Sequence, residues 1–425
     1  MIEMRKMKDS RVKWIGEIPD SWEIKPIRAD FKEVTAKNKY GQVKNALKFT
    51  YGEIVSKDNF CAEDDEYVAD TILNYTIVEP DTIMLNCLNL NFDFVSQRIG
   101  LVKQKGVITS AYLAFKPNTD RIISRYATYL FKSYDNCKAF HNMGGGVRKI
   151  LNFEELKKEL CLFPPVCEQQ AISDFLDEKC SEIDALTADI QKQIEVLEEY
   201  KKSLVFRAVS RGIKDIALKE TGLEVWMKIP ENWQLVDIKY IFEIVKRVAG
   251  REGYNVLSVT QKGLKIKDIE SNNGQQAENY SGYQFVYPTD YVMNHMDLLT
   301  GWVDCSTMFG VTSPDYRVFR LRDKENNDLI YFKHLMQCCY MSRIFYSLGQ
   351  GVSNLGRWRL QTSSFNNFMI PVPPLKEQQQ IAAYLDGRCS EIDSIIKEKQ
   401  QQLETLAEYK KSLIYEYVTG KKEVI

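Results

Sequence analysis

The sequence has few histidines and lacks the cysteine spacings that bind metals. Its three histidines are His141, His295 and His334, and none has a metal-ligand partner at helical spacing. The ten cysteines contain no C-x-x-C pair, and only Cys338 and Cys339 are adjacent. This pattern predicts reduced thiols and argues against a zinc site or a disulfide scaffold. We therefore expect no metal in this chain.

Catalytic motifs are also missing. The sequence contains no G-x-x-x-x-G-K-[ST] phosphate loop, no H-E-x-x-H and no nucleophile elbow. Gly144-Gly145-Gly146 does not follow a strand in a nucleotide-binding unit, so it is not a dinucleotide fingerprint. The acidic run at residues 63–66 is typical of a solvated loop rather than a metal site. We expect a non-catalytic chain that binds no cofactor of its own.

Long apolar runs and an excess of one charge are absent as well. No stretch of eighteen apolar residues occurs, and the first fourteen residues lack an apolar segment of signal-peptide length, which predicts a soluble, cytoplasmic protein that does not bind membranes. Lys and Arg number 57 against 58 Asp and Glu, so any contact with nucleic acid must come from local patches. With 425 residues, 44% of them hydrophobic, the chain should form more than one domain.

What the sequence does contain is one long stretch that occurs twice, beginning at Pro164 and at Pro373. After the opening prolines neither copy contains Gly or Pro except Gly387, which predicts two long helices. From Glu168 to Val209 such a helix would be roughly 60 Å long. Capping patterns at Ser181 and Ser390 could begin new helices, but we favour continuity. The copies align without a gap and share Pro164/Pro373, Glu168/Glu377, Gln169/Gln378, Ile172/Ile381, Leu176/Leu385 and the runs CSEID and EYKKSL.

Apolar residues recur every seven positions along each predicted helix, which is typical of a coiled coil. Lys399 interrupts the second stripe, and a polar residue there usually fixes register. If the helices pair antiparallel, the molecule is pseudo-symmetric. The stripe residues are Ile183, Ile190, Leu197 and Leu204 in the first copy and Ile392, Leu406 and Leu413 in the second; Leu186, Ile194, Tyr200, Ile395, Ile396 and Leu403 are expected at neighbouring seam positions.

The segments before the helices are distant copies of each other. Trp22 and Trp233 occupy matching positions after an Ile-Pro pair, and a buried packing anchor is the favoured interpretation. Alternating apolar runs predict strands at 80–90 and 106–115, with copies at 288–298 and 310–319, and helical stretches follow at 125–143 and 330–348. The expected fold is α+β, with two pseudo-repeated α/β domains separated by two long antiparallel coiled-coil helices. The expected boundaries are 1–163, 164–213, 214–372 and 373–425.

A glycine-containing loop with cations follows each shorter helical stretch. Glycine permits close approach of the backbone to a phosphate, and Arg supplies paired donors for phosphate or guanine. A helix C-cap with surface cations is the alternative. Because the loop recurs, we favour contact with DNA. Asn86 and Asn294, which follow apolar strands, could contact a base edge, although a turn-stabilising role is favoured. The candidate DNA-binding residues are Gly146, Arg148, Lys149, Gly351, Arg357, Arg359, Asn86 and Asn294.

Taken together, these motifs resemble the specificity subunits of type I restriction-modification systems, over essentially the whole chain. The matching motifs are W-x-G-x-I-P-x-x-W beginning at Trp14, the glycine loops with Arg148 and Arg357, and P-P-x-x-E-Q-x-x-I beginning at Pro164 and Pro373. The second copy departs from the first motif, with Val225 in place of Trp14 and Lys228 in place of Glu17, and its glycine loop is longer by four residues.

The resemblance implies two target-recognition domains that each bind one half of a split site in double-stranded DNA. It implies that the paired helices set the spacer length and dock two modification subunits, and it leaves room for a restriction subunit. The modification subunit would be an adenine-N6 methyltransferase carrying the S-adenosylmethionine site, which agrees with the absence of N-P-P-[FYW] here. The competing hypothesis is a non-catalytic protein-interaction scaffold that binds no nucleic acid.

Overall fold

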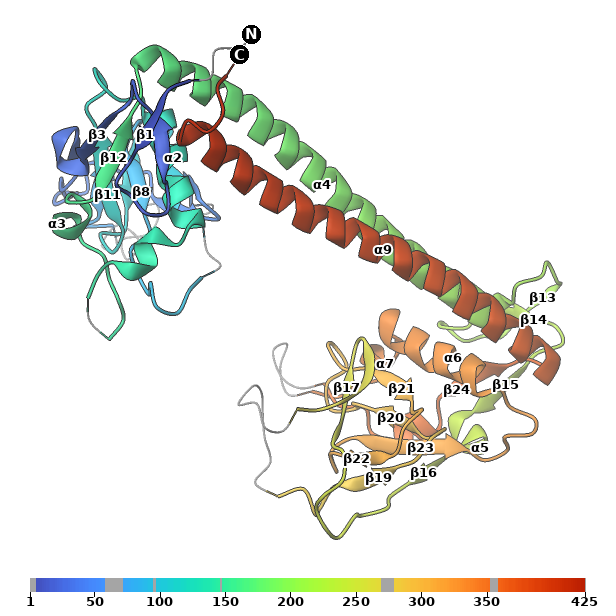
Figure 1. The fold of residues 1–425 in the computed structure, drawn as a ribbon. Coiled ribbons are helices and arrows are strands. Elements are labelled where there is room, and N and C mark those ends of the chain that lie inside the picture. The colour runs from blue at the N-terminus through green and yellow to red at the C-terminus, as the bar shows by residue number, and fades with distance from the viewer. Residues whose placement is uncertain are drawn as a thin grey trace. The chain divides into compact units, whose positions relative to one another are not determined.

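The computed structural model describes residues 5–57, 72–94, 97–145, 147–268, 279–351 and 358–424. The chain forms two compact units: unit 1 is Met1–Ile190 with Gln401–Ile425, and unit 2 is Gln191–Gln400. Each unit combines one globular part of strands and short helices with sections of both long helices (Figure 1). The α+β class predicted from the sequence is confirmed. The compact units cut across both long helices, whereas the predicted boundaries separate helix from globular part.

The globular part of unit 1 is built on a four-stranded antiparallel sheet surrounded by strand pairs. The sheet order is β4 (Phe31–Glu33), β11 (Leu113–Pro117), β8 (Ile83–Leu85) and β9 (Ile99–Leu101). The pairs are β1 (Met7–Asp9) with β2 (Glu17–Pro19), β3 (Glu23–Pro26) with β12 (Leu160–Phe163), β5 (Leu47–Thr50) with β6 (Glu53–Ser56), and β7 (Thr76–Val78) with β10 (Gly106–Ile108). The short helices are η1 (Ile27–Ala29), α2 (Ser124–Asn136), η2 (Ala139–Asn142) and α3 (Phe153–Leu156).

Unit 2 repeats this plan strand for strand. Its central sheet has the order β16 (Phe242–Val245), β23 (Arg317–Leu321), β20 (Tyr291–Met293) and β21 (Val303–Cys305). The pairs are β13 (Leu218–Glu220) with β14 (Lys228–Pro230), β15 (Gln234–Asp237) with β24 (Met369–Val372), β17 (Leu257–Thr260) with β18 (Gly263–Ile266), and β19 (Gln284–Val286) with β22 (Gly310–Thr312). The short helices are α5 (Ile238–Ile241), α6 (Leu329–Met341), α7 (Ile344–Ser347) and α8 (Thr362–Asn366).

One helix packs against the central sheet of each unit and completes its core. In unit 1 the rings of Phe31, Phe115 and Phe131 meet edge to face, and all three are buried. The helical stretches predicted at 125–143 and 330–348 each break into two helices. The reason is local, because Lys138 and Arg343 adopt left-handed backbone conformations with φ of 58° and 55°.

The two long helices are continuous. α4 (Val166–Arg211) has 46 residues and α9 (Leu375–Val418) has 44. The capping patterns at Ser181 and Ser390 lie inside these helices and begin no new one, so the predicted continuity is confirmed. No helix in the described ranges is long and apolar enough to cross a membrane.

The stripe residues are buried to different extents. Ile183, Ile190, Ile194, Ile392, Ile396 and Leu413 are buried, whereas Leu197, Leu204, Leu403 and Leu406 are half-buried. The expectation for three neighbouring positions was wrong, because Leu186, Tyr200 and Ile395 are 48%, 48% and 42% exposed. These three side chains flank the narrow buried stripe instead of filling it. Lys399 is half-buried in the seam, and its ammonium donates to Gln193 Oε1.

Ion pairs between the helices explain why two short runs recur in the sequence. In unit 2, Lys201 of the EYKKSL run in α4 reaches Asp393 of the CSEID run in α9, with Nζ 2.6 Å from Oδ2. In unit 1 the roles are exchanged, and Lys410 Nζ lies 2.6 Å from Asp184 Oδ1. Each run therefore contacts the other run on the opposite helix, which requires the helices to be antiparallel within each unit.

A buried joint connects each globular part to the long helix that follows it. Glu168 Oε2 accepts from the indole N–H of Trp22 at 2.9 Å, and Glu377 Oε2 accepts from Trp233 at 2.7 Å. The next residue is a buried glutamine in both helices. Gln378 Oε1 accepts from the backbone N–H of Asp328 at 2.8 Å, and its Nε2 donates to Pro373 O at 2.9 Å. Both tryptophans are at most 1% exposed, so the predicted packing anchor is confirmed.

We expect Gln378→Ala to destabilise unit 2. The substitution leaves the half-buried N–H of Asp328 and the buried carbonyl of Pro373 without their partner, which costs about 1–3 kcal/mol. Urea unfolding followed by tryptophan fluorescence measures this loss. The control is Gln379→Ala, because Gln379 is the neighbouring exposed glutamine of the same helix. Equal unfolding midpoints for the two variants would contradict the proposed strength of the joint.

Candidate nucleic-acid interface

The first glycine loop forms a short hairpin that projects from unit 1 (Figure 1). Gly145 and Ile150 form an antiparallel bridge, with the N–H of Ile150 donating to Gly145 O at 3.3 Å. Gly144 has φ of +82°, and a Cβ there would lie 2.7 Å from Ile150 O, so only glycine fits. The N–H of Leu151 then donates to Cys87 O at 3.1 Å. The loop is therefore a defined hairpin rather than a simple helix cap.

The second glycine loop has the same frame. Gln350 and Arg359 exchange backbone hydrogen bonds of 3.0 and 3.1 Å, and the N–H of Leu360 donates to His295 O at 3.0 Å. The N–H of Leu298 donates to Trp358 O, and the N–H of Leu90 donates to Lys149 O at the equivalent place in unit 1. These contacts pair Leu151 with Leu360, in agreement with the alignment of the two sequences.

One candidate cation is exposed on each hairpin. Arg148 is exposed and forms no hydrogen bond or ion pair with another described residue, and Arg359 is exposed as well. Lys149 is half-buried, and its Nζ is 3.5 Å from His141 O. Gly351 lies against the Trp358 ring, since a Cβ at this position would be 3.1 Å from the nearest ring atom. Two further candidates, Gly146 and Arg357, lie outside the described residues.

The two candidate asparagines stabilise turns. Asn86 Oδ1 accepts from the N–H of Leu88, and Asn294 Oδ1 accepts from the N–H of Met296, both at 3.3 Å. Both side chains are half-buried. This geometry is the turn-stabilising alternative that the sequence favoured. Contact of either residue with a base stays a prediction.

Two buried arginines, which sequence reasoning missed, hold the loops in place. Arg98 is fully buried and donates to the carbonyls of Asn86 and Leu88 at 2.9 and 2.8 Å and to that of Asp93 at 2.6 Å. In unit 2, Arg317 donates to Leu360 O at 3.0 Å and to Thr362 Oγ1 at 3.3 Å. Burial lowers the pKa of the Arg317 guanidinium to about 10, which leaves it charged at neutral pH. For Arg98 the available sequence signal was a single cation immediately before the uncharged strand β9, whereas Arg317 shares its strand with Arg320 and gave no such signal.

A third loop adjoins the same part of unit 1. The turn between β5 and β6 contains Tyr51, which is 88% exposed, and Gly52. A Cβ at Gly52 would lie 2.7 Å from Gln97 Oε1, and Gln97 precedes the buried Arg98. The corresponding turn in unit 2 is held by Asp304, whose Oδ2 accepts from the N–H of Leu264 at 3.0 Å. Each unit thus has three loops at one edge of its globular part, which we call the three-loop edge. They are the glycine hairpin, the loop that follows β8 or β20, and the turn between β5 and β6 or between β17 and β18.

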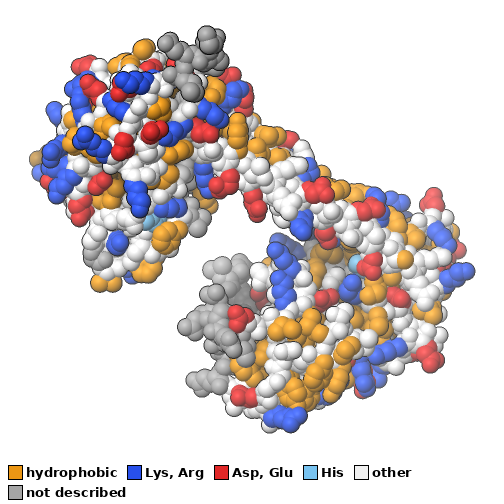
Figure 2. Space-filling view, in the orientation of Figure 1, with side chains coloured by type: hydrophobic (Ala, Val, Ile, Leu, Met, Phe, Trp, Pro, Cys, Tyr) orange, Lys and Arg blue, Asp and Glu red, His pale blue; other side chains and the backbone are white. Residues whose placement is uncertain are grey.

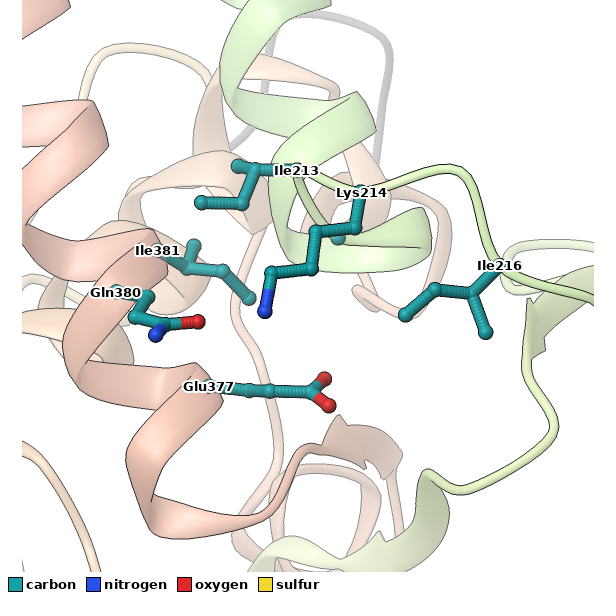
Figure 3. A pocket seen from close by; sticks show the side chains of 7 residues that line it. Ile213, Lys214, Ile216, Glu377, Gln380 and Ile381 are labelled. Atoms are coloured by element: carbon teal, nitrogen blue, oxygen red, sulfur yellow. The ribbon is translucent and has the colours of Figure 1, made fainter.

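The surface and the cavities offer little else for chemistry. On the face shown in Figure 2, cationic and anionic side chains are interspersed over both units. Within the described ranges, no group of three or more His, Cys, Asp or Glu is placed to hold a metal ion. A small cavity in unit 2 has room for about one water molecule (Figure 3). It is lined by Gly212, Ile213, Lys214, Ile216, Glu377, Gln380 and Ile381.

The comparison with known proteins agrees with this duplicated architecture. A family model described as the type I restriction modification DNA specificity domain matches residues 94–196 and 230–405, more than half of the chain. This chain belongs to the type I restriction-modification DNA specificity family. One matched segment lies in each half of the sequence, in agreement with the duplication.

Relatives of this family extend along most of the chain. The type I restriction enzyme MjaVIII specificity subunit of Methanocaldococcus jannaschii is 23% identical and covers 96% of this chain and 94% of that protein. The type I restriction enzyme EcoBI specificity subunit of Escherichia coli is 21% identical over 64% of this chain and 60% of that protein. A chain from a solved structure of a type I R-M system has the same fold, with a TM-score of 0.68 at 11% identity, covering 95% of this chain and 99% of that one.

We predict that Arg148→Ala weakens binding to duplex DNA. The loss should be about 1–3 kcal/mol if the guanidinium contacts guanine. If it contacts a phosphate, the slope of log affinity against log salt should instead fall by about one. Titrations at two salt concentrations separate these results. The control is Arg28→Ala, an exposed arginine on η1. Unchanged titrations of Arg148→Ala would place the hairpin away from DNA.

Proposed function

We propose that this chain is the DNA sequence-specificity subunit of a type I restriction-modification complex in the cytoplasm. Each globular part binds one half of a bipartite site, and the long helices set the spacer and dock two modification subunits. The observation that carries the proposal is the repeated three-loop edge. Two copies of one frame carry different side chains at equivalent positions, such as Lys149 and Trp358, which is what two different half-sites require.

Exposed apolar positions on the long helices support docking of two identical partners. Leu186 and Tyr200 of α4 are each 48% exposed, and the equivalent Ile395 and Tyr409 of α9 are 42% and 55% exposed. Fourteen residues separate the members of each pair, close to four helical turns, so both lie near one side of their helix. Aromatic and aliphatic side chains in such positions are typical of protein interfaces. The same patch on both helices favours two copies of one modification subunit.

We further propose that the chemistry belongs to the partners. The modification subunit would supply the adenine-N6 methyltransferase site with its S-adenosylmethionine, and a restriction subunit would add cleavage. This chain would supply binding, orientation and spacing. A division of this kind fits a sequence that lacks the usual catalytic and phosphate-binding motifs.

The direct test compares the purified chain with its complex. We expect the complex with the modification subunit to bind a duplex carrying the bipartite site with a steep salt dependence, because phosphate contacts release counterions. The chain alone should transfer no methyl group from S-adenosylmethionine. Salt-insensitive association with proteins and no affinity for duplexes would favour the interaction-scaffold alternative. Methyl transfer by the highly purified chain would refute the non-catalytic role.

A second experiment tests the helices as the element that sets the spacer. Four helix-forming residues inserted after Gln191 and four after Gln400 would lengthen α4 and α9 by roughly 6 Å each. At about 3.4 Å per base pair, the preferred spacer should grow by about one to two base pairs while both half-sites stay the same. Four residues also add about 40° of helical rotation beyond one turn, so affinity should fall.

Selection from a duplex library with variable spacers measures this preference. The matched control replaces four exposed helix residues at the same places without inserting any. An unchanged spacer optimum in the lengthened protein would show that the helices hold the complex together without measuring DNA. Altered half-site sequences would show that recognition resides in the helices.

A further inference from the structure

The loops around the first hairpin expose apolar side chains. Val147 at the hairpin tip is 92% exposed, the largest exposed fraction of any large apolar side chain in the described part of the chain. Phe92, on the loop that follows β8, is 70% exposed. Neighbouring apolar groups left in water at a protein surface mark interaction sites more often than folding requirements.

Both apolar groups are mounted on backbone that is firmly held. The side chain of Asn91 bridges the two segments, since its Nδ2 donates to Val147 O at 3.0 Å and its Oδ1 accepts from the N–H of Lys149 at 3.2 Å. The loop that carries Phe92 is held from beneath by the buried guanidinium of Arg98. These hydrogen bonds hold the backbone of both segments while the side chains of Phe92 and Val147 are exposed.

An exposed arginine adjoins these apolar groups. Arg148 follows Val147 and is exposed without a partner among the described residues. The carboxylate on the same loop, Asp93, lies 3.6 Å from Arg98 and is thereby neutralised. An apolar tip bordered by an available arginine is complementary to the base stack and phosphates of a nucleic acid rather than to an acidic or purely apolar protein surface.

We propose that Phe92 and Val147 form an apolar wedge that enters the base stack of the half-site bound by unit 1, while Arg148 contacts an adjacent phosphate. This inference rests on the proposed function and extends it to a residue-level mode of recognition. Wedges of this kind partly unstack a base step and kink the duplex. Pyrimidine–purine steps unstack most readily, so the wedge should favour a half-site that contains TA or CA/TG at the insertion point.

The aromatic part of the wedge has no counterpart at the matching position of unit 2. In unit 2 the position equivalent to Asn91 is Leu299, which is 49% exposed, and Phe92 is matched by Thr300. Trp358, which replaces Lys149, packs against Tyr346 with ring centroids 5.0 Å apart instead of pointing into solvent. The two units therefore present different chemistry from the same frame, and only one half-site should show unstacking.

The test uses the complex of the full chain with its modification subunit and an unmethylated duplex that carries the motif methylated by this complex. The base analogue 2-aminopurine is placed at successive positions of both half-sites. Binding should raise the fluorescence at one base step of one half-site. Phe92→Ala should abolish that rise and weaken binding about five- to a hundredfold, the range expected for loss of one stacked ring. Val147→Ala should reduce the fluorescence rise without abolishing it.

Two controls accompany this experiment. Tyr40→Ala removes an aromatic ring that is 83% exposed elsewhere in unit 1 and should leave both fluorescence and affinity unchanged. The adenine that the modification subunit methylates is flipped out of the stack by methyltransferases in general, so its signal should persist in Phe92→Ala and serves as the internal reference.

The outcomes separate the wedge from the proposed function. Tight binding of the parent without a fluorescence rise beyond the methylated adenine, or with a rise that survives Phe92→Ala, overturns the wedge and leaves sequence-specific binding intact. Absence of duplex binding by the parent complex overturns the proposed function and the wedge together. A rise at one step that is lost in Phe92→Ala and kept in Tyr40→Ala supports both.

Discussion

Each half of this protein depends on one buried polar joint between a globular part and the long helix that follows it. A glutamate at the start of the helix accepts from the indole of a buried tryptophan, Glu168 with Trp22 and Glu377 with Trp233. The adjacent buried glutamine, Gln169 or Gln378, bonds to the backbone at the start of α2 or α6 and to the carbonyl of Pro164 or Pro373. Unsatisfied buried polar groups are costly, so this joint fixes where the strand pairs end and the helix begins. Because the joint anchors the globular part, it also positions the three-loop edge.

Much of this architecture could be predicted because it is repeated and periodic. The absence of Gly and Pro predicted two uninterrupted helices, and α4 and α9 have that form. The seven-residue spacing correctly predicted the buried stripe. It does not show how wide the stripe is, so neighbouring positions were wrongly expected to be buried. Leu186, Tyr200 and Ile395 are exposed. The pairing of Lys201 with Asp393 depends on helix direction and register, which the separate runs did not reveal.

The candidate interface was predicted less completely, because loop contacts depend on tertiary geometry. Glycine and arginine located both hairpins, yet nothing in the sequence indicated that Gly145 and Ile150 would bridge or that Asn91 would join two loops. The buried Arg98 was overlooked because a lone arginine is ordinarily a surface residue. The asparagines Asn86 and Asn294 serve turns, for which short polar side chains beside strand ends are well suited.

The central claim is that the two globular parts recognise the two halves of one DNA site. Methylation-sensitive long-read sequencing of DNA from cells that carry this chain with its modification subunit tests it most directly. The account predicts methylated adenines within a single bipartite motif whose halves are separated by unspecified bases of fixed number, and this motif should vanish when the gene for the chain is deleted. Methylation confined to one continuous motif, or methylation that persists unchanged after the deletion, would contradict the account.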